Sequence, residues 1–311
     1  MNISVVVPVY NEEENIIRLI QKIKPILSTT PGNHEILFID DGSKDKTYEV
    51  LQKCSQEDKS VKVIKFLKNF GQTAALNAGF RHAKGEVIVT MDGDLQNDPS
   101  DIPKLLEKLE RGYDVVSGWR YNRRDPSLKK VLPSLIASFI RRRIIGDKVH
   151  DSGCSLKAYR QEVVKDLKLL GESHRFIPLI LQLQGCKIGE VKVNHYPRKF
   201  GKTKYGVKRL WNGLFDILGL IFWHKYGTKP LYIFGAISLF SMCTAVFVVL
   251  YVFLIAFLQG VRVSVGPLLL FSVLLFLAGI QTFLIGIIAE MQTRLYYNDK
   301  ESYTIEKMLN E

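Results

Sequence analysis

The segment Val87–Gln96, with the sequence VIVTMDGDLQ, joins an apolar strand to a pair of acidic side chains. Val87–Met91 is an apolar, largely β-branched run of the length of a buried strand. Asp92 and Asp94 follow one residue apart, and Gln96 adds an amide oxygen. Hard divalent cations such as Mg²⁺ and Mn²⁺ prefer oxygen ligands of this kind. An ordinary polar turn has the same composition, so the rest of the chain must decide between the two interpretations.

Strand-like and helix-like segments alternate through the first 120 residues. Apolar β-branched runs predict strands at 3–9, 35–39, 61–66, 87–91 and 115–117, and apolar residues at helical spacing predict helices at 12–27, 44–54, 71–83 and 99–111. This alternation predicts an α/β, Rossmann-like domain with a mainly parallel sheet and helices on both faces. Ligands of such sheets bind beyond the carboxyl ends of the strands, which is where the acidic pair falls.

Two further polar clusters follow strands of this predicted sheet. The first strand ends in Val7–Glu12 (VPVYNE), and the second ends in Phe38–Ser43 (FIDDGS). Helix capping accounts for Asn11 and Ser43. It does not account for the proline and tyrosine of the first cluster or for the adjacent aspartates of the second. A carboxylate at a strand end can accept a hydrogen bond from a nucleotide base or a ribose hydroxyl, so both clusters are candidate nucleotide contacts.

The C-terminal part of the chain holds two long apolar runs. Residues 231–258 and 265–289 contain no charged side chain, and a short connector with Arg262 separates them. As helices of about 1.5 Å per residue, both are long enough to span a bilayer core of about 30 Å. Buried core helices of this length without a charge are rare. Lys225, Lys229, Arg294 and Lys300 flank the pair on the outside, so the positive-inside rule predicts a hairpin with both ends in the cytoplasm.

The formal net charge is +12, and the basic residues gather at 120–148 and 198–229. The second cluster leads into the apolar region, which favours an anionic membrane surface and phosphate-bearing ligands. No nucleic-acid-binding motif is present in the sequence, and no nucleic-acid partner is expected. The four cysteines form no C-x-x-C pair, so a disulfide framework or zinc site is not expected, and a reducing compartment fits.

Two basic amphipathic stretches lie near 128–145 and 210–224. The first has an apolar stripe flanked by lysines and arginines, and the second carries Trp211 and Trp223. Each is expected to be a helix. The first could pack on the sheet or lie in the membrane interface, and the tryptophans of the second suit the headgroup region.

The three strand-end motifs, taken in this order, resemble the family-2 inverting glycosyltransferases of GT-A fold. Three more segments narrow the resemblance. Val116–Tyr121 (VSGWRY) and Arg198–Tyr205 (RKFGKTKY) are similar to the phosphate-binding segments of dolichol-phosphate mannose synthases, with Thr203 where a serine is usual. Asp151–Arg160 (DSGCSLKAYR) resembles the bacterial undecaprenyl-phosphate sugar transferases, whose pair of C-terminal membrane helices also matches. The resemblance covers essentially the whole chain.

The resemblance implies roles for particular residues. Nucleotide-sugar contacts are implied for Pro8, Tyr10, Glu12, Asp40, Asp41, Asp92 and Gly93. Mg²⁺ or Mn²⁺ ligands are implied for Asp92, Asp94 and Gln96. Catalytic roles are implied for Asp92, Asp94, Arg120, Arg198 and Lys204. The three basic residues among them would contact phosphate. One departure matters: some relatives carry an acidic base where this chain has Cys154, and the nearest carboxylate is Asp151.

We therefore expect inverting transfer of a sugar from a UDP- or GDP-linked donor to an undecaprenyl or dolichyl phosphate. The expected organisation is a cytoplasmic GT-A domain over 1–229, two transmembrane helices within 230–290 and a cytoplasmic tail over 291–311, in a multi-pass cell-membrane protein. A homo-oligomer is left open. Two alternatives compete with this function. A processive polysaccharide synthase would need a Q-x-x-R-W segment, which 208–211 does not supply, and a non-catalytic tethered binding module would not need the intact acidic pair.

Overall fold

The computed structural model describes residues 1–121, 146, 149–167, 169, 171–197, 219, 222, 225–227, 229–263 and 266–297. The chain divides into two compact units, Met1–Ile217 and Leu218–Glu311. The expected amphipathic helices near 128–145 and 210–224 fall outside the described residues, apart from isolated positions. So do Arg198 and Lys204, and the part of the tail beyond residue 297.

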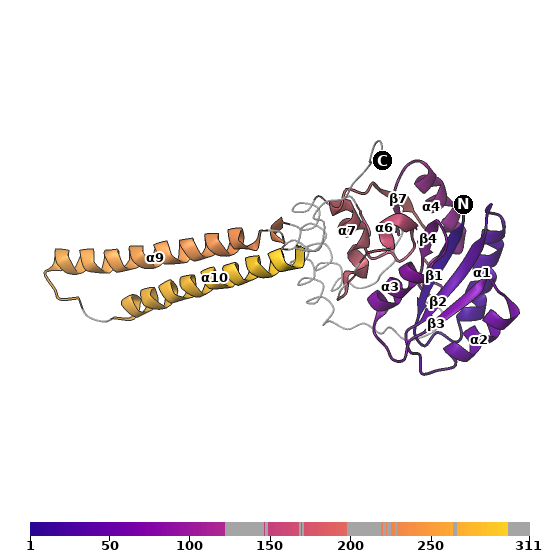
Figure 1. The fold of residues 1–311 in the computed structure, drawn as a ribbon, viewed down its shortest axis with the longest axis horizontal. Helices are drawn as coiled ribbons and strands as arrows, with labels where there is room; N and C mark the ends of the chain where they lie inside the picture. The colour runs from indigo at the N-terminus through magenta and orange to yellow at the C-terminus, as the bar shows by residue number, and fades with distance from the viewer. Residues whose placement is uncertain are drawn as a thin grey trace. The chain divides into compact units, whose positions relative to one another are not determined.

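The first unit is built on a seven-stranded sheet of order β3-β2-β1-β4-β6-β5-β7 (Figure 1). The strands are β1 (Ile3–Val9), β2 (His34–Asp40), β3 (Val61–Lys65), β4 (Val87–Thr90), β5 (Val115–Trp119), β6 (Lys157–Arg160) and β7 (Ile188–Lys192). All neighbouring pairs are parallel except the two that involve β6, which is antiparallel to β4 and to β5. Every strand other than β6 therefore points its carboxyl end toward the same edge of the sheet.

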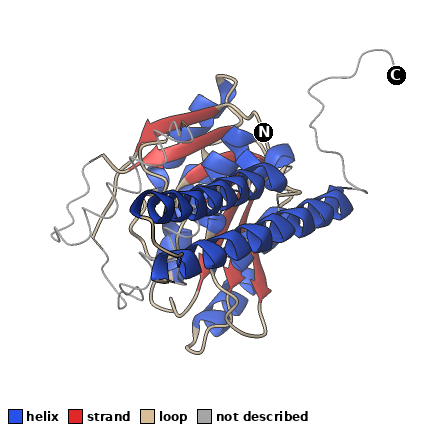
Figure 2. Ribbon diagram, turned by 90° about the vertical axis from the view of Figure 1, so that its left-hand side faces the viewer, coloured by secondary structure: helices blue, strands red, loops and turns tan. Residues whose placement is uncertain are grey.

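Helices cover both faces of the sheet, and Figure 2 shows the strands in red among blue helices. The helices are α1 (Ile16–Ser28), α2 (Thr47–Glu57), α3 (Gln72–His82), α4 (Ile102–Glu110), α6 (Gln161–Val164) and α7 (Ile177–Leu183), with the 3₁₀ turns η1 (Pro99–Asp101) and η3 (Ser173–Phe176). Alternate residues of β1 face opposite sides: Val5 and Val7 pack with α1 and α4, and Val6 packs with α3. This alternation creates one apolar core on each face of the sheet.

Helix α1 begins at Ile16, so the prediction that it starts at residue 12 was wrong. The reason lies in the adjoining loop. Asn11 has a left-handed φ of 53°, and its backbone N–H donates to Ser43 Oγ at 2.9 Å. The Glu12 N–H donates to Thr47 Oγ1 at 2.8 Å instead of joining the helix. The side chains of Ser43, in the loop after β2, and Thr47, at the start of α2, thus satisfy the backbone ahead of α1 and connect the regions of the first two motifs.

Strands β6 and β7 were not anticipated from the sequence. Strand β6 is only four residues long, KAYR, and carries two charged side chains, so it has no apolar run to indicate a strand. It is inserted between β4 and β5, far from both in the sequence. This insertion brings the segment 151–160 beside the acidic pair.

The second unit contains α9 (Pro230–Gln259) and α10 (Pro267–Tyr297), an antiparallel pair (Figure 1). By length and composition, both helices are long and apolar enough to cross a membrane. They pack closely through small residues: Ser238 Oγ donates to the Gly279 carbonyl at 2.7 Å, and Ser241 Oγ donates to the Leu275 carbonyl at 2.9 Å. Helix α10 continues beyond the expected end at residue 289 and includes a Glu290–Arg294 ion pair one turn apart.

Candidate active site

The three acidic or polar motifs meet at the carboxyl edge of the sheet, because β1 lies between β2 and β4. Val9 pairs with Asp40, and Val6 pairs with Thr90. The Asp41 N–H donates to the Val9 carbonyl at 2.9 Å, which continues this pairing beyond the strands. Residues at the ends of β1, β2 and β4 are therefore neighbours, although the first and second motifs are roughly 30 positions apart and the second and third roughly 50.

The adjacent aspartates after β2 differ in their contacts. Asp41 accepts hydrogen bonds from the Phe70 N–H at 2.7 Å and the Gly71 N–H at 2.9 Å, so it holds the loop ahead of α3. Burial raises the pKa of Asp41, and the charge of Asp40 adds to this effect. Asp40 is fully buried and accepts from the Ser43 N–H through Oδ1, while its Oδ2 has no hydrogen-bond partner among the described residues. A buried carboxylate oxygen without a partner is costly unless a ligand supplies a donor.

The acidic pair lies directly after β4 on a tightly turned loop. Asp92 is half-buried, and its Oδ1 accepts from Gln72 Nε2 on α3 at 2.8 Å. Asp94 is only 5% exposed, and its Oδ1 accepts from the Gln96 N–H at 3.1 Å. Burial, followed by the charge of Asp94, raises the pKa of Asp92 to about 6. Two carboxylates forced together in this way form an anionic pair that a cation would stabilise.

The backbone of this loop is strained and tightly packed. Leu95 has a φ of 61°, a left-handed value that is rare for a bulky residue and is often found at functional sites. A Cβ atom at Gly93 would lie 2.7 Å from Val9 Cγ1, so only glycine fits between the acidic residues. The expected metal ligand Gln96 is turned toward β7, with its Nε2 donating to the Tyr196 carbonyl at 3.4 Å.

A charged cluster lies on the other side of the acidic pair. Arg120, after β5, makes a two-pronged ion pair with Asp151: Nε to Oδ2 at 2.6 Å and Nη2 to Oδ1 at 2.8 Å. Lys157 on β6 is 4% exposed, and its Nζ donates to the carbonyls of Ser152 and Cys154. Burial lowers the pKa of Lys157. The positive charges of Lys157 and Arg120 act against burial and partly offset the rise in the pKa of Asp92. Both cations therefore lie within electrostatic reach of that carboxylate.

Two residues considered for the role of a base have unsuitable environments. The Cys154 thiol is fully buried in the core, and this burial raises its pKa to about 11. Burial alone would raise the pKa of Asp151, but the hydrogen bonds and charge of Arg120 outweigh burial and lower it. A carboxylate with a lowered pKa is a weak base, and Arg120 already occupies both of its oxygens.

The remaining expected contacts lie at the same edge with modest exposure. Pro8 is the next-to-last residue of β1, Tyr10 follows that strand, and both are partly buried. Glu12 lies in the turn before α1, and its Oε2 accepts from Asn15 Nδ2 at 2.6 Å. Within the described ranges, no three acidic, histidine or cysteine side chains converge to hold a metal. A cation at Asp92 and Asp94 would therefore need further oxygen ligands from a bound phosphate, as is usual for Mg²⁺.

Sequence reasoning missed Gln72 and Lys157. Gln72 is the first residue of α3, and nothing in its local sequence indicates contact with a residue twenty positions later. Lys157 offered a weak signal, because a charged residue inside a buried strand needs a specific partner.

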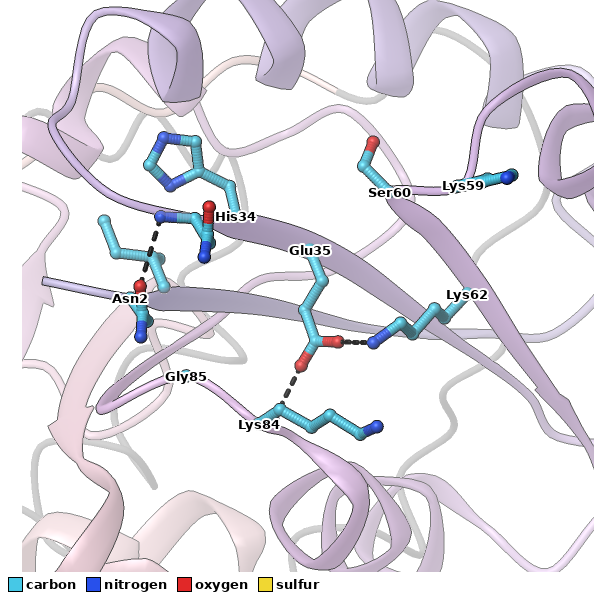
Figure 3. A pocket seen from close by; sticks show the side chains of 10 residues that line it. Asn2, His34, Glu35, Lys59, Ser60, Lys62, Lys84 and Gly85 are labelled. Carbon is cyan, nitrogen blue, oxygen red and sulfur yellow. Dashed lines mark hydrogen bonds and ion pairs between the residues drawn. The ribbon is translucent and has the colours of Figure 1, made fainter.

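A separate hollow of about 270 Å³ lies at the opposite, amino edge of the sheet. Figure 3 shows Glu35 at its centre, between the Lys62 side chain and the backbone of Lys84. Glu35 is 6% exposed and also accepts from Ser4 Oγ at 2.5 Å, so its carboxylate has its hydrogen bonds satisfied within the protein. This hollow lies at the opposite edge from the acidic pair, and its hydrogen bonds hold the amino ends of the strands together.

Comparisons with known proteins agree with this geometry. Residues 4–168 match the family model described as Glycosyl transferase family 2. The chain is 39% identical over 306 residues to a dodecaprenyl-phosphate galacturonate synthase of Rhizobium johnstonii, covering 97% of this chain and 90% of the relative. It is 35% identical over 299 residues to an undecaprenyl-phosphate 4-deoxy-4-formamido-L-arabinose transferase of Pseudomonas paraeruginosa, covering 94% and 86%.

Solved structures show the same fold. Glucosyl-3-phosphoglycerate synthase from Mycobacterium tuberculosis, in complex with Mn²⁺, UDP-glucose and phosphoglyceric acid, has a TM-score of 0.55 and 19% identity, over 72% of this chain and 79% of that one. The chain belongs to glycosyltransferase family 2, and it is a glycosyltransferase. The predicted fold, a GT-A sheet followed by two apolar helices, is confirmed.

Proposed function

We propose that this glycosyltransferase transfers a sugar, with inversion, from a UDP- or GDP-linked donor to a polyprenyl phosphate at the cytoplasmic face of a membrane. One observation carries the proposal: a relative named for a dodecaprenyl-phosphate product matches 97% of this chain, a length that includes both apolar helices. Helices of this length suit a bilayer, which is also where a polyprenyl chain would reside.

The donor would bind at the carboxyl edge of β1, β2 and β4. The buried Asp40 Oδ2 is available as an acceptor for a base N–H or a ribose hydroxyl. Asp41 remains a proposed donor contact, and its carboxylate also accepts from the Phe70 and Gly71 N–H groups next to α3. Pro8, Tyr10 and Glu12 remain proposed donor contacts from the β1 side, and Gly93 from the β4 side.

Asp92 and Asp94 fit a divalent cation, because their oxygens are hard ligands and because burial, followed by the charge of Asp94, raises the pKa of Asp92 to about 6. Gln96 remains a third candidate ligand. Mg²⁺ or Mn²⁺ bound here would neutralise the charge on the leaving diphosphate. Gln72 on α3 orients Asp92 through its hydrogen bond. The left-handed backbone at Leu95 sets the direction of the loop that carries Asp92 and Asp94.

The acceptor does not need a protein base in this proposal. A phosphate monoester has a second pKa of about 6 and is already anionic near neutral pH. The low pKa of Asp151 and the high pKa of Cys154 agree with a site that positions charge and removes no proton. Arg120, kept in place by Asp151, would contact phosphate, together with Arg198 and Lys204, which lie beyond the described residues. Holding two phosphate groups close against their repulsion is then the main catalytic task.

The test is release of nucleoside diphosphate by the full-length enzyme in detergent, with undecaprenyl phosphate and Mn²⁺ each present or absent. We expect release only when both are present, with the lipid-linked sugar as product. Asp94→Asn should reduce turnover by at least roughly a hundredfold without loss of folding, since it removes a direct ligand worth several kcal/mol of charge stabilisation. Asp166→Asn, at an exposed carboxylate beyond α6, is the matched control.

Asp94→Asn turnover within tenfold of the wild-type rate would overturn the metal assignment. Release that does not depend on polyprenyl phosphate would overturn the acceptor.

A further inference from the structure

The exposed apolar side chains of the first unit gather at one edge. Among the described residues of this unit, the large hydrophobic side chains classed as exposed are Met1, Ile17, Leu67, Phe70, Tyr121 and Tyr196. Four of these six follow carboxyl ends of strands: two follow β3, one follows β5 and one follows β7. Since these strands run parallel, all four side chains lie along the edge that carries the acidic pair. Single exposed apolar residues are normal, but Leu67 and Phe70 lie together at the β3 end of this edge, and Tyr121 and Tyr196 lie toward its other end.

The most exposed of them, Leu67, is presented by a well-anchored loop. Its side chain is 98% exposed, and that of Phe70 is 57% exposed. The loop is held at both ends: the Phe66 N–H donates to the Asp40 carbonyl at 2.8 Å, and Asp41 accepts from the Phe70 N–H at 2.7 Å. The Phe66 and Phe70 rings contact edge to face at 5.8 Å. Leu67 is therefore fixed in a position where the described residues of the first unit do not bury it.

Lysines alternate with these apolar side chains. Lys65 and Lys68 are exposed on either side of Leu67, and Lys68 Nζ lies 5.2 Å from the Phe70 ring centre. At the other end of the edge, Lys192 Nζ lies 3.9 Å from the ring centre of Tyr121. Aromatic and aliphatic tips interleaved with lysines are typical of surfaces that meet anionic lipid headgroups.

We propose that Leu67 and Phe70 insert into the headgroup region of an anionic bilayer, with Lys65 and Lys68 on lipid phosphates. The chain itself provides the reason for a bilayer as the occupant, because it continues into two helices able to cross one. The acceptor phosphate would lie in the headgroup plane, a step that rests on the proposed function. Docking this edge on the lipid would bring the acidic pair to that plane.

The direct test places a polarity-sensitive fluorophore at residue 67 of the full-length protein in nanodiscs. Leu67→Cys is compared with Ile17→Cys, on the exposed side of α1, in a parent whose Cys54, Cys186 and Cys243 are alanine. We expect a blue shift and strong quenching by spin-labelled lipid at position 67 only, and weaker quenching when phosphatidylglycerol is replaced by phosphatidylcholine. Equal quenching at both positions would overturn the proposal. So would shielding that appears only in nanodiscs holding two copies, which would assign the surface to a second chain.

A kinetic experiment distinguishes membrane insertion of Leu67 from a role in donor binding. Leu67→Asp should raise the KM for undecaprenyl phosphate in nanodiscs by roughly tenfold, because burial of one leucine side chain is lost. Donor affinity measured by calorimetry should not change, and Ile17→Asp should leave both quantities unchanged. Weaker donor binding by Leu67→Asp would instead assign the loop to the donor and overturn the membrane role. Quenching needs no turnover, so its result stands even if the proposed sugar transfer fails.

Discussion

At the scale of single residues, Asp92 has a carboxylate whose negative charge is unfavourable in the folded protein. Its carboxyl group is half-buried beside Asp94, and its Oδ1 accepts a hydrogen bond from Gln72 Nε2. Burial and the neighbouring charge raise its pKa to about 6, although Lys157 and Arg120 partly oppose the shift. A group that is kept costly in the free protein and would be relieved by a cation makes this edge the candidate active site.

This cost predicts a stabilising mutation. The ordinary Asp pKa is 3.8 and the folded value is about 6, so the folded state holds the proton more tightly than the unfolded state. Stability should therefore fall as pH rises from about 4 to about 6 and remain lowered above that range. Without divalent cations at pH 7.5, Asp92→Asn should stabilise the protein by an amount on the order of 1 kcal/mol, although activity is lost.

Chemical denaturation of wild type, Asp92→Asn and the control Asp166→Asn at pH 4 and pH 7.5 measures this effect. We expect the gain in unfolding free energy of Asp92→Asn over wild type to be smaller at pH 4 than at pH 7.5. A variant less stable than wild type at pH 7.5 would contradict the account.

At the scale of elements, β7 positions the charged cluster through one carboxylate. Glu190 Oε1 accepts from the backbone N–H groups of His150 at 2.8 Å and Asp151 at 3.1 Å, and Oε2 lies 2.7 Å from His150 Nδ1. The ring of His150 in turn stacks on Trp119, with ring centres 4.5 Å apart. Asp151 reaches Arg120 from a backbone segment that Glu190 holds in place.

Glu190→Ala should release this segment and weaken the hold of Asp151 on Arg120. We expect turnover to fall by roughly tenfold, the effect of a modest misplacement of a charged group, with little change in nucleotide affinity. Steady-state kinetics together with calorimetric nucleotide binding test this, with Glu162→Ala on α6 as an exposed control. Unchanged turnover would show that Arg120 is held well enough by its own strand.

The two apolar helices also depend on a close contact. A Cβ atom at Gly279 would lie 2.6 Å from Met242 Cγ and 3.2 Å from the Ser238 carbonyl oxygen, whereas one at Gly235 would meet nothing within 4 Å. Small residues at such positions let helix backbones approach in membranes. Gly279→Leu should lower the melting temperature of the detergent-solubilised hairpin by several degrees, and Gly235→Leu should not. Equal effects of the two substitutions would mean that the helices pack differently in lipid.

At the scale of the whole molecule, the acidic edge and the two apolar helices belong to different compact units. The proposed donor contacts within the described residues belong to the unit Met1–Ile217, and both apolar helices belong to the unit Leu218–Glu311. Each unit has its own packing, as domains capable of separate folding do. The net charge of +12 suits a protein that works on anionic substrates at an anionic surface.

Removal of residues 230–311 should leave a folded domain that still binds nucleotide. We expect it to work on a short, water-soluble prenyl phosphate and to work poorly on a long-chain acceptor in a bilayer, because it has lost the two helices able to cross a bilayer. Rates for both forms of the enzyme on both acceptors make the comparison. Equal rates on the long-chain acceptor would show that the helices contribute nothing to its use.

The sequence by itself determined the strand ends, the acidic pair and the two apolar helices. These features are local: an apolar run followed by carboxylates is read within ten residues, and a span of the bilayer is read from its length. Parallel strands then place the motifs at one edge without any knowledge of side-chain contacts. The helix start at Ile16 escaped this reasoning, because the side chains of Ser43 and Thr47, between β2 and the first turn of α2, satisfy the preceding backbone.

Only the tertiary structure decided which side chains surround the acidic pair. Gln72 reaches Asp92 from α3, and Lys157 approaches through the antiparallel insertion of β6. The pairing of Arg120 with Asp151 likewise joins residues 31 positions apart. Local sequence cannot specify such contacts, because they depend on how strands and helices distant in the chain pack together, and packing is set by the whole core.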